Sequence, residues 1–118
     1  MNSLFTIQQV GPATVVAIHS VALMESNDIE AISEALSLQV DTQNKRKLVI
    51  DFTTVEYMSS RAINMILTLK KKLSEIAEAE LILCGIGPRL MDIVRITRLD
   101  KVLNLKPTQQ DAIACLHT

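Results

Sequence analysis

The sequence predicts an α/β domain built on a mostly parallel β-sheet. Short apolar runs typical of buried strands alternate with segments whose apolar residues recur at helical spacing. The chain also opens with two runs of β-forming residues separated by Gly11-Pro12-Ala13, which is typical of an antiparallel hairpin. Because alternating strands and helices imply right-handed crossovers, we expect the element order ββαβαβαβα, with about four α-helices.

The N-terminal hairpin is expected to pair residues 4–10 with residues 14–19. A short irregular stretch should follow. The first helix is expected to begin at Asn27, since Asn27 followed by Glu30 resembles a capping box. The apolar residues of this helix repeat every three or four positions: Ile29, Ile32, Leu36 and Val40.

Two compact apolar runs, residues 47–52 and 81–84, are typical of strands that are buried on both faces of a parallel sheet. The most regular helical pattern in the chain lies between them. Its apolar stripe consists of Ala62, Ile66, Leu69, Leu73 and Ile76.

The C-terminal third predicts two more helices and one strand. Proline is tolerated in the first turn of a helix, so a helix should follow Gly87-Pro88 and run to about Ile96. Residues 102–106 predict the last strand. Thr108 can cap a final helix, in which Asp111 lies near the positive end of the helix dipole.

Length and composition predict one domain, residues 1–118, and exclude several classes of function. With 118 residues, 48% of them apolar, the chain can form one core. The net charge of −1 creates no field that would attract nucleic acid, and 3% aromatic residues leave little for stacking on bases. We therefore expect no nucleic acid partner, and a monomer when the protein is free.

The cysteines and the hydropathy pattern predict a reduced, cytoplasmic protein without cofactors. Cys84 and Cys115 have neither the spacing of a disulfide framework nor nearby metal ligands. The first residues lack the pattern of a signal peptide, and no segment has the ~20 apolar residues of a membrane span. We expect no membrane insertion and no bound metal.

Ligands of open α/β sheets commonly bind at the carboxyl ends of the strands, where two loops could carry chemistry. Residues 85–90 resemble a dinucleotide-binding loop, but Leu90 stands in place of the third glycine, which favours a simple turn. Asp51 closes the first buried strand without a nearby second carboxylate or histidine. Its expected role is structural, as a hydrogen-bond acceptor at the strand end.

The other loop, residues 57–62, contains Ser59 and Ser60 before the second helix. Serine is a favoured helix cap, and the same position suits a phosphate, because free N–H groups and the helix dipole favour an anion. A nucleophilic serine would need a base and the Gly-x-Ser-x-Gly turn, and no glycine flanks these serines. The only histidines, His19 and His117, are remote in sequence, so we do not expect an enzyme.

Two segments resemble the STAS domain family, which is named for sulfate transporters and anti-sigma factor antagonists. Residues 48–52, Val55 and residues 58–63 are similar to the strand, loop and Asp-Ser-Ser-Gly-Leu helix start of that family. Residues 96–103 resemble its Thr-Gly-Leu-Asp-Lys segment. The resemblance covers nearly the whole chain and agrees with the element order.

The resemblance implies a phosphorylation site. In anti-sigma factor antagonists of this family, a kinase that is also the anti-sigma factor phosphorylates the first serine of the motif. Counting without gaps from Asp51 places that serine at Ser60, and a slip of one residue would select Ser59. The sequence departs from the motif where Ser59 replaces the acid, Arg61 the second serine and Ala62 the glycine. Residues 21–24 also replace the usual Gly-x-Leu-Asp.

The implied function is partner switching controlled by serine phosphorylation, with an anti-sigma factor or related serine protein kinase and a serine phosphatase as partners. The alternative is a constitutive structural subunit of a larger signalling or lipid-transport ATPase assembly. The residues expected to contact a partner are Met24, Met58, Ser59, Ser60, Arg61 and Asn64.

Overall fold

A computed structural model describes residues 4–116 and confirms the predicted fold class. Its main sheet has five strands in the order β1-β2-β4-β6-β7. Only β1 and β2 pair in antiparallel fashion, and the other neighbours are parallel. The strands are β1 (Phe5–Val10), β2 (Ala13–Ile18), β4 (Lys47–Asp51), β6 (Glu80–Cys84) and β7 (Asn104–Lys106).

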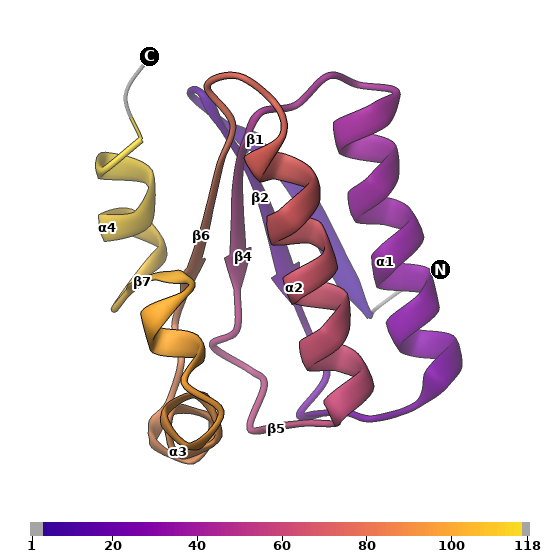
Figure 1. The fold of residues 1–118 in the computed structure, drawn as a ribbon, viewed down its shortest axis with the longest axis vertical. Coiled ribbons are helices and arrows are strands. Elements are labelled where there is room, and N and C mark those ends of the chain that lie inside the picture. Colours follow the sequence, from indigo (N-terminus) through magenta and orange to yellow (C-terminus); the bar gives the residue numbers. More distant parts are fainter. Residues whose placement is uncertain (1–3, 117–118) are drawn as a thin grey trace.

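Helices cover both faces of this sheet (Figure 1). The two longest, α1 and α2, lie side by side on one face, α4 lies on the other, and α3 packs beyond the lower end of the strands (Figure 1). None of the helices in residues 4–116 is long and apolar enough to cross a bilayer. The helices are α1 (Ser26–Asp41), α2 (Ser60–Ser74), α3 (Pro88–Ile96) and α4 (Gln109–Ala114).

The core is divided by the sheet because successive side chains of a strand point to opposite faces. Leu48 and Ile50 of β4 belong to the larger cluster, beneath α1 and α2, whereas Val49 belongs to the smaller cluster with Ala112 of α4. These three side chains of β4 have no exposed surface. This confirms the prediction that the strand is buried on both faces.

A second, two-stranded parallel sheet was not predicted. It pairs β3 (Ala22–Leu23) with β5 (Tyr57–Met58), in the segments that precede α1 and α2. Two-residue strands are too short to create an alternating pattern in the sequence. The stretch expected to be irregular is therefore held by backbone pairing.

Several predicted boundaries were wrong by one or two residues, among them the start of β2, at Ala13 rather than residue 14, and the end of α2, at Ser74 before Ile76. The first helix begins at Ser26 rather than Asn27, because Ile29 N already donates to Glu25 O at 3.0 Å and closes the first turn. The last strand begins at Asn104 rather than at residue 102, because the preceding residues form the 3₁₀ helix η1 (Leu99–Lys101). The predicted cap of α4 is confirmed, since Thr108 Oγ1 accepts from Asp111 N at 3.1 Å.

Gly85 occupies a place that no other residue fits. Its φ is +72°, and a Cβ atom there would clash with Thr53 Oγ1 and lie 2.9 Å from Thr53 N. The backbone after β6 thus passes directly against the turn that follows β4. Gly87, two residues later, has a φ of −79°, and a Cβ atom added to it would have no neighbour within 4 Å.

We expect Gly85→Ala to lower the free energy of unfolding by about 2 kcal/mol or more, through left-handed strain and the clash with Thr53. Gly87→Ala is the matched control and should change it by less than about 1 kcal/mol. Urea denaturation of both variants measures the difference. Equal destabilisation would show that the contact with Thr53 does not matter.

Candidate functional site

The start of α2 assigns different environments to the two adjacent serines. Ser59 is the N-cap residue, partly buried, and its Oγ accepts from Ala62 N at 3.2 Å. Ser60 is the first residue of the helix and is exposed. No other residue among 4–116 hydrogen-bonds to the Ser60 hydroxyl. Ser59 therefore stabilises the helix start, while the Ser60 hydroxyl is available to another molecule.

The small sheet positions this helix start. Leu23 O accepts from Ser59 N at 3.1 Å, and Val21 O accepts from Glu56 N at 2.7 Å and from Tyr57 N at 3.1 Å. The segment before α1 is thereby fixed against the segment before α2. As a result, residues 21–23 lie beside the segment that leads into Ser60.

Three exposed apolar side chains lie around these paired segments: Val21, Met24 and Tyr57, with 51%, 56% and 40% of their surface exposed. Residues 4–116 have only seven large apolar side chains that are exposed, so three in one place form a concentration. We call Val21, Met24, Tyr57 and Ser60 the Ser60 surface. Met24 was expected from the sequence, whereas Val21 and Tyr57 were not, because their proximity depends on the unpredicted pairing.

The remaining predicted contact residues differ in accessibility. Met58 is only 7% exposed and packs in the larger core cluster, so its prediction as a contact residue was wrong. Arg61 is exposed, and its Nη1 donates to Ser26 Oγ at 3.2 Å, which connects the starts of α2 and α1. Asn64 is exposed one turn further along α2.

Asp51 connects the carboxyl end of β4 to the loop that follows it and to the start of α4. Its Oδ1 accepts from Thr53 N at 2.9 Å and from Thr53 Oγ1 at 2.5 Å. Its Oδ2 accepts from Gln109 Nε2 of α4 at 3.0 Å. Asp51 thus has the hydrogen-bonding role expected from the sequence, and it fixes the first turn of the loop that leads to Tyr57 and Ser60.

A hollow of about 340 Å³ lies between this loop and the start of α3. Arg89, one of its lining residues, donates through Nη1 to the Tyr57 hydroxyl, and its Cζ lies 5.6 Å from the ring centroid. Its Nε lies 3.8 Å from Glu56 Oε1. Arg89 therefore orients Tyr57 at the edge of the Ser60 surface.

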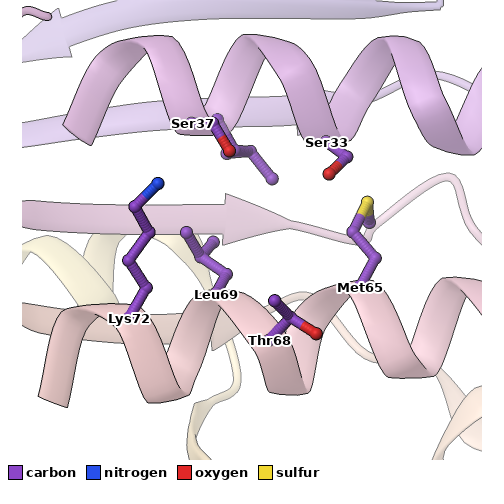
Figure 2. Close-up of a pocket in the computed structure, with 7 residues that line it drawn as sticks. Ser33, Ser37, Met65, Thr68, Leu69 and Lys72 are labelled. Carbon is purple, nitrogen blue, oxygen red and sulfur yellow. The ribbon is translucent and has the colours of Figure 1, made fainter. Parts of the chain in front are cut away.

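A smaller cavity of about 70 Å³ lies between α1 and α2. Figure 2 shows Ser33 and Ser37 of α1 facing Met65, Leu69 and Lys72 of α2 across it. Ligand pockets usually have about 300–1,000 Å³. This cavity is too small for a cofactor and reflects the short serine side chains at the helix interface.

No histidine among residues 4–116 is hydrogen-bonded to Ser59 or Ser60. His19 Nε2 lies 3.1 Å from Thr6 Oγ1 and contacts neither serine, and His117 lies outside the described residues. Residues 4–116 contain no group of three or more histidine, cysteine or acidic side chains that could hold a metal ion.

Fold and site together define an α/β domain that presents an exposed serine, at the start of its second helix, within a partly apolar surface. The chain belongs to the STAS domain family, which matches residues 6–112. It is 25% identical over 96 residues to BtrV of Bordetella bronchiseptica, described as a candidate anti-sigma factor antagonist, and the match covers 81% of each chain.

Solved structures share the fold. An anti-sigma factor antagonist (STAS) domain protein from Planctomyces limnophilus is 21% identical and superposes with a TM-score of 0.82, covering 96% of this chain and 97% of that one. The phosphorylated form of the Bacillus cell fate determinant SpoIIAA is 18% identical, with a TM-score of 0.74, covering 96% and 99%.

The capping difference between the serines predicts different effects on stability. Ser59→Ala removes the oxygen that accepts from Ala62 N and should lower the free energy of unfolding by about 1 kcal/mol. Ser60→Ala is the matched control and should change it by less than about 0.5 kcal/mol. Thermal and urea denaturation check this. The assignment of the cap to Ser59 fails if Ser60→Ala is the more destabilising change.

Cys84, paired with Asp51 in the sheet, makes stability depend on alkaline pH. Burial, aided by the Asp51 charge, raises the pKa of its thiol from 9.0 to about 12. The folded state therefore keeps a proton that the unfolded state loses above pH 9.0, so the free energy of unfolding should fall as pH rises from about 9 to 12.

Cys84→Ala lacks the thiol and should show a smaller decline than the parent protein over the same pH range. The difference between the two denaturation profiles isolates the thiol from other groups that titrate there. Parallel profiles would contradict the assignment.

Proposed function

We propose that this protein is an anti-sigma factor antagonist that binds an anti-sigma factor or related serine protein kinase through the Ser60 surface. The observation that carries the proposal is an exposed serine, whose hydroxyl has no hydrogen-bond partner among residues 4–116, next to paired segments that expose three large apolar side chains. Such side chains are stabilised when a partner buries them. The names of BtrV and the Planctomyces limnophilus protein support the same class of partner.

Phosphorylation of Ser60 would reverse this binding. A phosphate adds about −1.5 to −2 charges, and burying it against apolar side chains carries a large desolvation penalty. A hundredfold loss of affinity requires only about 2.8 kcal/mol. The proposal is supported by SpoIIAA, whose solved structure shares this fold and is of a phosphorylated form.

The helix start favours Ser60 over Ser59 as the modified residue. The Ser59 oxygen accepts from Ala62 N, so its modification would disturb the cap. A phosphate on Ser60, the first helical residue, would lie near the positive end of the helix dipole. The protein could therefore gain and lose the phosphate while it keeps its fold. In this proposal the kinase and a serine phosphatase perform the chemistry, and this chain is not an enzyme.

Binding measurements on Ser60 variants test the switch. With a candidate kinase, titration calorimetry should give Ser60→Ala the affinity of the parent and Ser60→Asp an affinity weaker by about tenfold or more, because the carboxylate imitates part of the phosphate charge. Ser74→Asp, at the exposed far end of α2, is the matched control and should bind normally.

Equal binding by Ser60→Asp and the parent, together with no phosphate in the intact mass after incubation with the kinase, would favour the constitutive structural subunit instead. Met24→Asp separates the two questions, because it should weaken binding in either case. Normal binding by Met24→Asp would place the partner on a different surface.

A further inference from the structure

The charges of this chain are distributed unevenly over two surfaces outside the Ser60 surface. Helix α1 contains four acidic residues and no basic one. Residues 95–102, at the end of α3 and in η1, contain three basic residues and one acidic residue, Asp100. Both surfaces also expose large apolar side chains that are not part of the core.

The basic surface combines Ile96 and Val102, which are 81% and 54% exposed, with Arg95, Arg98 and Lys101. Ile96 is the most exposed of the seven large apolar side chains left uncovered in residues 4–116. The chain turns tightly here, since Arg98 N donates to Arg95 O and Lys101 N donates to Arg98 O, both at 3.1 Å. None of the three cations forms an ion pair with another residue of 4–116. We call these five residues the basic knob.

The acidic surface is a hollow of about 320 Å³ along the second half of α1, whose lining includes Glu34, Leu38 and Asp41. Leu38 is 52% exposed. Asp41 is already paired with Lys72, at 2.6 Å. Glu34 of the hollow, and Glu30, which lies one helical turn before Glu34 and outside the hollow, form no ion pair within residues 4–116. We call this the acidic hollow.

We propose that the basic knob of one copy docks into the acidic hollow of a second copy. Ile96 and Val102 would cover Leu38, and the three cations would face Glu30 and Glu34. The two surfaces cannot meet within one molecule, because α1 and α3 lie on opposite sides of it (Figure 1). Charge complementarity between two exposed apolar surfaces of the same chain selects a second copy as the occupant.

The contact is head to tail, because it joins two different surfaces. A dimer therefore keeps one free knob and one free hollow at its two ends, and further copies add in a row as concentration rises. Met24, Tyr57 and Ser60 belong to neither surface, so the association does not rest on the proposed function. A monomer is expected only in dilute solution.

Sedimentation velocity of the full chain tests this association. The average mass should rise with protein concentration in low salt and fall when about 0.5 M NaCl screens the charge contacts. Ile96→Asp and Leu38→Asp should each weaken the association by about tenfold or more, because each buries a charge in the contact. Ile7→Asp, at an exposed apolar residue of β1 outside both surfaces, is the matched control and should associate normally.

Mixing the two blocked variants gives the sharpest result. Ile96→Asp retains an intact hollow, and Leu38→Asp retains an intact knob. An equimolar mixture should therefore form dimers and no larger species, while each variant alone stays monomeric. Circular dichroism verifies that both are folded, and Arg95→Glu replaces Ile96→Asp if that variant unfolds. The proposal is overturned if the parent protein stays monomeric at every concentration, if either variant associates like the parent, or if the mixture stays monomeric.

Discussion

The candidate site depends on the pairing of two short segments that are far apart in the sequence. Val21 O and Leu23 O accept from the backbone just before α2, which fixes where that helix begins and which residue caps it. The same pairing brings Val21 beside Tyr57 and leaves both exposed. Without it, the exposed side chains of residues 21–24 would have no fixed position beside the start of α2. A few backbone hydrogen bonds therefore assemble the exposed surface that we propose as the binding site.

A second constraint keeps this arrangement in place at the carboxyl ends of the strands. The Asp51 carboxylate accepts from Thr53 on one side and from Gln109 of α4 on the other, so one side chain connects the loop after β4 to the helix on the opposite face. Gly85 allows the neighbouring strand to leave the sheet in contact with Thr53. The loop toward Tyr57 thus starts from a fixed turn. Its rigidity limits the entropy that would be lost when a partner orders the surface.

The elements that the sequence predicted well are those whose side-chain pattern is long. The buried runs of β4 and β6 and the apolar stripe of α2 contain enough residues to reveal their period, and they determine the fold class. Strands β3 and β5 contain two residues each, and only tertiary pairing defines them. Met58 looked like a contact residue because it precedes the serines, but alternation within β5 turns it into the core and leaves Tyr57 exposed. The sequence located the site, whereas the contact surface depends on pairing that no local pattern reveals.

The division of labour between Ser59 and Ser60 follows from helix geometry. The side-chain oxygen of an N-cap residue accepts a hydrogen bond from a backbone N–H of the first turn, whereas the side chain of the next residue is not needed for capping. Ser59 stands where the family motif has an acid, and it retains the capping function that an acid would also perform, without the charge. Of the two serines, only Ser60 could therefore take a phosphate and leave the cap intact. In the proposed switch, the Ser59 cap would hold the helix start whether or not Ser60 carried a phosphate.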